Sequence, residues 1–509
     1  MKNKRIFIPL CMLALTVLVS ACGDASQNTG ITLSADGVAV NGVAAEYDAG
    51  AAVYLEKKVE AHPDVAEENK NVENTVVNIT RAGRYTISGA REDTQIVVSA
   101  GDKDAVELVL DGADISCKTA PAILVKSAKE SGKGGEASVT LRLNDGSVNK
   151  VSGSHTARIN DDDVKYDGAI SSAVSLAIEG EGALELNSDN EGIESKMHLT
   201  VNDGNIRIIS KNDALNASED GVSVITLNDG YLYCHVDASG EEGDGIDSNG
   251  NIVINGGTVI SYANATSQDS GLDADGGTTI NGGVVLACGN MQDEVNRDSK
   301  QVYMQLMFKE VQDADVLNVL TDENGNPVAA FQIPSSYRNV QLSTPELKAG
   351  KYKLYRGGTL VADMKDGLAS NLTSYSPGEQ LSNGGEMELG MGMPPSRMQP
   401  PEGFKEGEMP QPPEGMELPE GAEPPQGFKD GERPEMPGNM PQRPDGAKRP
   451  ERFEEGEMPE LPEGAGKPDG FRGGGKGPGG MRGGFSAEVT DIFEVGDENR
   501  MFFNITPAE

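Results

Sequence analysis

The stretch Asp244-Gly245-Ile246-Asp247-Ser248, followed by Ile254-Asn255-Gly256-Gly257-Thr258, decides the fold of this chain. The turn pattern within it, Asn-(Asp/Gly)-Gly-x followed by an aliphatic residue, recurs at intervals of 26, 27 and 26 residues. Its copies begin at Asn202, Asn228, Asn255 and Asn281. A fixed period of this length indicates that one structural unit is repeated and stacked.

Each copy of the turn is preceded by a second recurring feature, called the anchor here. The anchor is an aliphatic residue flanked by Gly or Ala and a polar residue. The anchors are Ile193, Leu215, Ile246 and Leu272, with a weaker copy at Ile170. The anchor lies nine residues before the Asn in three of the four copies and 13 residues before it in the copy of Leu215, which therefore carries a four-residue insertion. Between the anchors, apolar and polar residues alternate as in strands.

Short strands separated by glycine turns cannot bury an apolar face alone, but stacked coils can, because equivalent Val, Ile and Leu residues meet at strand spacing. The chain contains no proline from residue 122 to 326, which fits coils whose backbone N–H groups are all needed for hydrogen bonding. The sequence therefore predicts an all-β protein whose residues 76–292 form a right-handed parallel β-helix. Residues 75–99 and 105–125 are read as early coils.

The composition limits both core and function. The chain has 509 residues, a formal net charge of −38 and no Trp, and aromatic residues make up 5% of it. The core must therefore be aliphatic. Binding of nucleic acid by a basic surface is excluded, because phosphate neutralisation needs an excess of Lys and Arg. Cys117, Cys234 and Cys288 are odd in number and scattered, so they are interpreted as small buried hydrophobic residues.

The N-terminus has the pattern of an export signal. Basic residues precede an apolar run at 6–19 that is too short to span a bilayer, and Val19-Ser20-Ala21-Cys22 follows. This resembles a bacterial lipoprotein signal at residues 1–21, with Cys22 as the lipidation site; an ordinary signal peptide cut near Ala21 is the alternative. We expect a protein on the extracellular face of the membrane, attached through its lipid only. Residues 22–75 are predicted to be a linker and cap.

Beyond the coils, strand-like runs at 301–308, 316–320, 328–331, 340–343 and 352–355 predict a small β-sandwich-like module at residues 293–390. Asp322-Glu323-Asn324-Gly325 is read as a hairpin turn between two of these strands. Residues 391–485 are rich in Pro, Gly and Glu, so they cannot bury a core and are predicted to be disordered. Residues 486–509 regain strand character and are expected to return to the module.

Acidic residues cluster around the anchor residue of each copy. Equivalent positions in stacked coils lie about 4.8 Å apart, and like charges at that spacing repel. Calcium, with oxygen ligands at about 2.3–2.6 Å, would bridge two successive coils and offset the charge. Plain solvated turns and a catalytic metal are the alternatives, and Asp161-Asp162-Asp163 is a weaker candidate site. The predicted metal ligands are Glu191, Glu194, Asp213, Asn216, Asp244, Asp247, Asp269, Asp273 and Asp275.

These motifs resemble a bacterial carbohydrate-binding domain family typified by a clostridial cell-surface protein. The resemblance runs from about Val76 to Met391 and is carried by the Asp-Gly-Ile unit at Asp244 and the Ile-Asn-Gly-Gly turn at Ile254. Asp213-Ala214-Leu215-Asn216 departs from the family pattern by replacing the Gly. The resemblance implies a pectate-lyase-like parallel β-helix that carries calcium and binds acidic (pectic) or cellulosic polysaccharide without catalysis. A monomer is expected.

Two other functions stay open. A calcium-dependent pectate-type lyase needs a basic side chain that takes a proton from the sugar, and Lys196, two residues after Glu194, is the candidate. A surface lysine paired with a neighbouring acid is the plainer interpretation of Lys196. A purely structural envelope protein is the third class. Absorbance of unsaturated product from polygalacturonate would distinguish a lyase from a binding protein.

Overall fold

The computed structural model describes residues 28–59, 66–129, 137–155, 165–293, 295–296, 298–384, 386–388, 489–496 and 500–508. Within these ranges the chain consists of strands and turns without a helix, which confirms the predicted all-β class. Consequently, this described part holds no helix of the length and hydropathy needed to cross a membrane. Cys22, Asp161-Asp162-Asp163 and residues 391–485 lie outside the described residues.

One sheet, here called sheet 1, contains nine strands, and all of its pairings are parallel except that of β4 with β5. Its strands are β4 (Val53–Val59), β5 (Glu73–Ile79), β7 (Thr94–Ser99), β9 (Ile123–Ser127), β12 (Gly168–Ser172), β15 (Glu191–Ser195), β18 (Leu215–Ala217), β21 (Ile246–Ser248) and β24 (Asp273–Ala274). Successive strands of sheet 1 are one repeat apart in sequence, so each repeat adds one strand to it.

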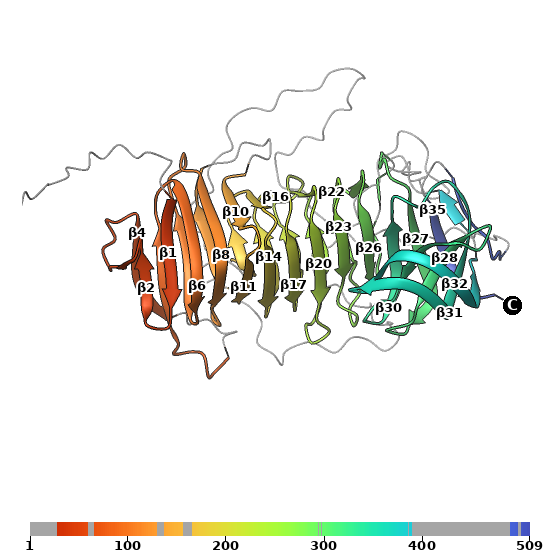
Figure 1. Ribbon diagram of the computed structural model, residues 1–509, viewed down its shortest axis with the longest axis horizontal. Helices are drawn as coiled ribbons and strands as arrows, with labels where there is room; N and C mark the ends of the chain where they lie inside the picture. Colours follow the sequence, from red (N-terminus) through yellow and green to blue (C-terminus); the bar gives the residue numbers. More distant parts are fainter. Residues whose placement is uncertain are drawn as a thin grey trace, which may run out of the picture. The chain divides into compact units, whose positions relative to one another are not determined.

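Two further runs of parallel strands come from the remaining parts of each repeat, and Figure 1 shows their strands side by side. Sheet 2 contains β1 (Asn28–Ser34), β6 (Gly83–Arg91), β8 (Val106–Ser116), β10 (Val139–Leu143), β13 (Leu176–Glu179), β16 (Leu199–Val201), β19 (Val224–Leu227), β22 (Asn251–Ile254) and β25 (Thr278–Ile280). Sheet 3 continues from the end of β8 through β11 (Val148–Gly153), β14 (Ala183–Ser188), β17 (Asn205–Ser210), β20 (Tyr231–Val236), β23 (Thr258–Tyr262) and β26 (Val284–Gly289).

The aliphatic anchors of the repeat stack upon one another in sheet 1. Ile193 pairs with Leu215, and Leu215 pairs with Ile246. All three side chains are fully buried in the main apolar core. The four-residue insertion follows β18, where the N–H of Gly221 donates to the carbonyl of Asn249 in the next coil at 2.6 Å. The insertion therefore leaves the pairing register of the apolar anchors unchanged.

The repeated Asn residues form a ladder along the turns between sheets 2 and 3. The Nδ2 of Asn228 donates to Oδ1 of Asn202 at 2.8 Å, Asn255 donates to Asn228 at 2.8 Å, and Asn281 donates to Asn255 at 2.9 Å. Gly257 follows in the same turn with φ of 73°, and a Cβ there would lie 2.6 Å from a backbone oxygen of the neighbouring coil. The Asn-Gly-Gly pattern thus reflects side-chain stacking and close contact between coils.

A β module follows the last coil and is joined to it by antiparallel pairing of β26 with β30. Its strands are β27 (Tyr303–Gln312), β28 (Asn318–Asp322), β29 (Pro327–Phe331), β30 (Tyr337–Ser343), β31 (Gly350–Lys365), β32 (Leu368–Ser382), β33 (Glu386–Glu388), β34 (Phe493–Val495) and β35 (Arg500–Pro507). The C-terminal strands do return to the module, because β35 pairs with β27, β32 and β33. The hairpin predicted at Asp322–Gly325 also forms, between β28 and β29.

Two predictions about element lengths differ from the structure. The predicted short strand at 352–355 is the start of β31, which has 16 residues and forms a long hairpin with the 15-residue β32. Parallel strands also begin earlier than residue 76, because β1 at Asn28–Ser34 pairs in parallel with β6. β2 (Gly37–Val40) and β3 (Val43–Ala44) extend this N-terminal cap in antiparallel pairing. β1 lacks the Asn-Gly-Gly signature, so the repeated pattern does not predict it.

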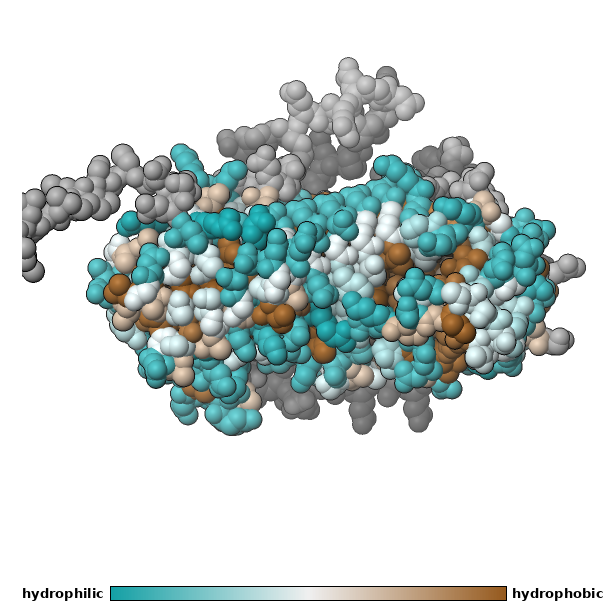
Figure 2. All heavy atoms as spheres, viewed as in Figure 1, coloured by the Kyte–Doolittle hydropathy of each residue, from teal (hydrophilic) through white to brown (hydrophobic). Residues whose placement is uncertain are grey.

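The module packs on the outward face of the last coils. Ile260, Tyr262, Leu286 and Cys288 point away from the coil interior and belong to the same apolar cluster as Phe308 of β27. Cys117 and Cys234 lie in the coil core instead. On the face drawn in Figure 2, most residues are hydrophilic or of intermediate hydropathy, and apolar residues form separate small groups.

Candidate functional site

Sheet 1 places one polar residue of each coil in a single row. Glu194 pairs with Asn216, Asn216 with Asp247, and Asp247 with Asp273. Each of these residues follows its buried anchor by one position, so the anchors hold the row in register. Parallel in-register pairing is the reason that side chains 22 to 31 residues apart in sequence become neighbours in space.

A second row begins three residues earlier in each coil and contains Glu191, Asp213 and Asp244. Backbone hydrogen bonds align it: Gly192 N donates to the carbonyl of Asp213 at 2.9 Å, and Ala214 N donates to that of Asp244 at 3.2 Å. The two rows meet at Asp244, Asp247 and Asp273, where one carboxylate oxygen from each residue lies within 4.8 Å of the others. We call these three residues the acidic triad.

The acidic triad has an unusual electrostatic state. Burial, followed by the charges of Asp213 and Asp273, raises the pKa of Asp244 well above its ordinary value. Burial and the neighbouring Asp273 and Asp275 raise the pKa of Asp247 to about 7. Burial also raises the pKa of Asp273. Three carboxylates this close together repel one another when ionised, so a nearby positive charge would favour their ionised forms.

Four more of the predicted ligands, Glu191, Glu194, Asp213 and Asn216, are buried at the neighbouring coils. Asn216 Nδ2 donates to Oε1 of Glu191 at 3.1 Å. Glu191 Oε2 and Asn216 Oδ1 have no hydrogen-bond partner although both atoms are buried. Burial and the charges of Glu194 and Asp167 raise the pKa of Glu191. The donor set here is again made of oxygens, the ligand type that calcium takes.

The carboxylates also hold the backbone of adjacent coils. Asp213 Oδ1 accepts the N–H of Asp244 at 2.7 Å, and Asp244 Oδ1 accepts the N–H of Ser270 at 2.6 Å. Such bonds favour the ionised form and leave the second oxygen of each carboxylate for another ligand. The turn interpretation and the calcium interpretation of these residues are therefore compatible with each other.

Asp269 and Asp275 lie outside the acidic triad. Asp269 precedes Ser270, the residue aligned with Asp244, so it is one position out of the row. Its Oδ2 accepts the N–H of Gly243 at 2.7 Å and also contacts the Ser267 hydroxyl. Asp275 is exposed, and its charge contributes to the raised pKa of Asp247. The spacing of four between Asp269 and Asp273, against three between Asp244 and Asp247, is the signal for this offset.

Lys196 lies beside the buried acids rather than free in solvent. Its Nζ forms an ion pair with Glu194 Oε1 and lies 4.0 Å from Asp167 Oδ2. Glu194 Oε2 in turn accepts the N–H of Asp167 at 2.8 Å and the hydroxyl of Ser171 at 3.1 Å. Lys196 therefore contacts two neighbouring carboxylates, as expected for a lysine paired with nearby acids.

Sequence reasoning did not single out Asp167 or Asp293 as part of this region. Asp167 precedes Gly168, which pairs with Glu191, and its side chain contacts Lys165 at 2.6 Å. Asp293 Oδ2 accepts the N–H of Ala274 at 3.0 Å. Both lie outside the repeated motif, so their approach to the rows depends on how the chain enters and leaves the coils. Their only sequence signal is that each lies next to the repeated segment.

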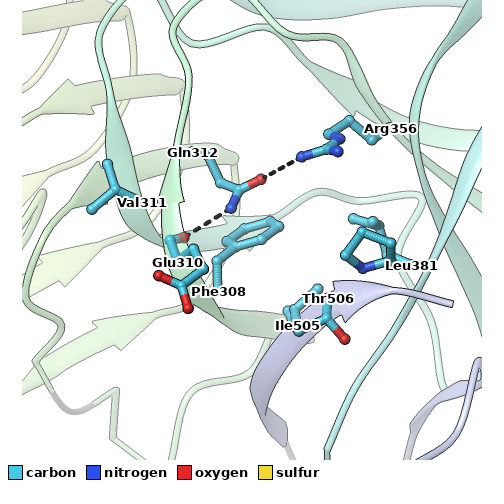
Figure 3. Close-up of a pocket in the computed structure, with 9 residues that line it drawn as sticks. Phe308, Glu310, Val311, Gln312, Arg356, Leu381, Ile505 and Thr506 are labelled. Carbon is cyan, nitrogen blue, oxygen red and sulfur yellow. Dashed lines mark hydrogen bonds between the residues drawn. The ribbon is translucent and has the colours of Figure 1, made fainter.

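A cavity of about 150 Å³ lies in the module, and its lining side chains are drawn in Figure 3. Phe308 and Leu381 form apolar walls, and Gln312 Nε2 donates to the carbonyl of Glu310 at 2.8 Å. Gln312 Oε1 also lies 3.5 Å from Nη1 of Arg356. Small-molecule sites usually measure about 300–1,000 Å³. This cavity is smaller and contains no residue of the two acidic rows.

A family model described as "carbohydrate-binding domain-containing protein" matches residues 73–392, and the chain belongs to that family.

A protein of the same description from Acetivibrio thermocellus is 34% identical over 134 residues, which cover 26% of this chain and 44% of that relative. Among solved structures, the chain is similar to the polysaccharide lyase-like protein from C. thermocellum, in its gadolinium derivative. That match has 21% identity and a TM-score of 0.31, and it covers 53% of this chain and 91% of the other.

Proposed function

We propose that this protein is a cell-surface lipoprotein whose coils, wound as a right-handed parallel β-helix, bind acidic polysaccharide through calcium, without catalysis. The observation that carries the proposal is the acidic triad, in which Asp244, Asp247 and Asp273 present oxygens within 4.8 Å of one another. Membership of a carbohydrate-binding family supports a polysaccharide partner. Oxygens bound to one calcium at about 2.4 Å lie at most about 4.8 Å apart, so the triad fits this ion.

The chemistry of the surrounding residues supports a cation of this kind. The unpartnered Glu191 Oε2 and Asn216 Oδ1 add two oxygens without compensating hydrogen bonds, and an unpaired buried polar atom is costly. When bound, calcium would supply a positive charge that a sugar carboxylate can share. The chain's own residues would hold the ion from one side, and uronate oxygens would complete its coordination. A uronate-rich polysaccharide is therefore a better partner than uncharged cellulose.

A lyase would need a basic side chain free to contact the sugar, whereas Nζ of Lys196 is paired with Glu194 and lies 4.0 Å from Asp167 Oδ2. We therefore propose binding rather than catalysis. Lipid attachment at Cys22 would place the coils at the extracellular face of the membrane, where they can contact polysaccharide. A monomer suffices for this role, because all residues of the acidic triad come from one chain.

The test compares the wild-type protein with Asp247→Asn, which keeps the side-chain volume and removes one triad charge. We expect the wild type to bind polygalacturonate much more tightly in calcium than in EGTA, and the variant to lose about tenfold or more of its affinity in calcium. Calcium at 100 times its Kd should also stabilise the wild type by about 2.7 kcal/mol and the variant much less.

Asp229, an exposed acid in the turn between sheets 2 and 3, provides the matched control, because Asp229→Asn removes the same charge elsewhere. Equal binding by wild type and Asp247→Asn, or binding unaffected by EGTA, would contradict the calcium role. Unsaturated product released from polygalacturonate would instead establish a lyase. If no glycan binds under any condition, a structural envelope role is the remaining candidate.

A further inference from the structure

The tip of the β31–β32 hairpin contacts sheet 3, far from it in sequence. Lys365 pairs with Leu368, so Asp366 and Gly367 form the two-residue loop. Their φ values of 49° and 83° are those of a type I′ turn, for which Asp-Gly is a favoured sequence. Figure 1 shows the hairpin extending from the module across the last strands of sheet 3.

Sheet 3 holds both oxygens of the Asp366 carboxylate. Arg207 Nη1 contacts Oδ1 at 2.6 Å, and the hydroxyl of Tyr231 donates to Oδ2 at 2.8 Å. The hydroxyl of Tyr262 donates to the backbone carbonyl of Asp366 at 2.7 Å. These contacts join residues 104 to 159 positions apart. The position of the turn is therefore fixed by these three coil residues, here called the receptor, as well as by the hairpin itself.

The receptor is preorganised by aromatic rings. The guanidinium carbon of Arg207 lies 3.8 Å from the ring centroid of Tyr233, which is buried. Nζ of Lys365 lies 3.3 Å from the ring centroid of Tyr231. The side chain of Arg207 is 42% exposed, so this site lies at the surface of sheet 3. A fixed guanidinium beside an aromatic hydroxyl and ring is a combination that binds a carboxylated sugar.

We propose that Arg207 and Tyr231 form a calcium-independent subsite for the carboxylate of a uronate sugar, which Asp366 occupies as an internal ligand. The hairpin tip thus competes with the polysaccharide and lowers its apparent affinity. This subsite rests on the proposed function, since it assumes an acidic polysaccharide partner. It is distinct from the acidic triad, which lies on sheet 1 and not on sheet 3.

The charges around the subsite limit it to one sugar carboxylate. Glu185 pairs in register with Arg207 on the side away from Tyr233, and Glu185 Oε2 lies 3.5 Å from Nζ of Lys150. A second carboxylate next to Arg207 in that direction would meet the charge of Glu185. We therefore expect binding of a single uronate residue at this point of a longer chain.

The experiment measures the binding of trigalacturonate by calorimetry in EGTA, so that calcium-dependent sites do not contribute to binding. Asp366→Gly removes the internal carboxylate and preserves the turn, because Gly-Gly is also a type I′ sequence. We expect affinity for trigalacturonate to rise about tenfold over the wild type. Adding Arg207→Ala to this variant should abolish the gain, and Tyr231→Phe, which keeps the ring, should reduce it.

A second variant displaces the tip without altering Asp366 or the receptor. A Cβ at Gly367 would lie 2.4 Å from the hydroxyl oxygen of Tyr262 and 2.8 Å from the carbonyl of Gln332. Gly367→Ala should therefore unseat the turn and also raise the affinity in EGTA. Asp363→Asn is the matched control, because it removes one negative charge from the same hairpin, at a carboxylate that accepts a hydrogen bond from Asn371 Nδ2 at 2.8 Å.

The outcomes separate this proposal from the function on which it rests. Unchanged affinity in Asp366→Gly and Gly367→Ala, with calcium-dependent binding of polygalacturonate intact, would overturn the subsite alone. An equal gain in Asp363→Asn would show a general charge effect and would also overturn it. Absence of uronate binding both with and without calcium would overturn the proposed function together with the subsite. A fully methyl-esterified trigalacturonate should bind no more tightly to Asp366→Gly than to the wild type.

Discussion

At the scale of single residues, the acidic rows combine two tasks. Asp213 and Asp244 each accept a backbone N–H from the next coil, so they help to hold the stack together. Their burial beside other carboxylates raises their pKa values, which opposes the ionised form that a cation needs. Binding of a divalent ion would reverse this balance, because its charge favours ionised oxygens.

His198 gives a separate prediction about pH. Its ring is buried, which lowers its pKa, and its Nδ1 accepts the N–H of Val224 at 3.1 Å. The unfolded chain binds a proton at the ordinary pKa of about 6.5, and the folded chain binds it only at lower pH. Stability contributed by neutral His198 is therefore present above about pH 6.5 and lost as the pH falls toward the folded-state value.

We expect His198→Gln, which cannot take up a proton, to show a weaker loss of melting temperature than the wild type between about pH 7.5 and pH 5.5. Each unit of pKa difference corresponds to about 1.4 kcal/mol. Thermal melts in EGTA at several pH values measure this difference. Because the acidic rows are present in both proteins, the comparison isolates the histidine, and parallel pH profiles would contradict the prediction.

At the scale of elements, the turns between sheets 2 and 3 are joined by the Asn ladder. Asn255 takes part in two ladder bonds, one donated to Asn228 and one accepted from Asn281. Asn255→Ala should lower the free energy of unfolding by about 1–2 kcal/mol, because a hydrogen bond contributes about 0.5–1.5 kcal/mol net. Urea denaturation measures the change.

Asn281→Ala is the natural comparison, because it removes the single ladder bond that Asn281 donates to Asn255. Its effect should be about half that of Asn255→Ala if the ladder bonds contribute equally. Equal stability of both variants and the wild type would show that the repeated Asn residues do not stabilise the stack.

At the scale of the whole molecule, the coils and the module share an apolar boundary. Phe493 and Phe502, from the C-terminal strands, are fully buried in the cluster that covers Ile260 and Leu286 of sheet 3. Strands that are more than a hundred residues later in sequence thus complete the cover of the last coils. Coil and module stability should therefore be coupled.

A chain that ends at residue 488 lacks β34 and β35, and its module should be less stable than that of the full chain. Burial of each large apolar side chain contributes about 1.5–3 kcal/mol, and Phe493, Phe502 and Ile505 would all be lost. We expect a second, lower-temperature unfolding transition and increased binding of an apolar dye, with the aliphatic coil core still folded. A chain shortened by residues 508–509 alone is the control, and one unchanged transition in both would contradict the coupling.

The repeat period, the aliphatic anchors and the glycine turns were enough to predict an all-β chain and to place the polar rows at the anchors. Those features are local and periodic, so the sequence of each coil predicts the structure of that coil. The tertiary structure decided what periodicity cannot express: Asp269 is out of row by one residue, and Asp167 approaches Glu194 from outside the repeat. It also decided that Asp366 meets Arg207. Such contacts depend on where non-repeating segments pack, because only the folded chain brings together residues 159 positions apart.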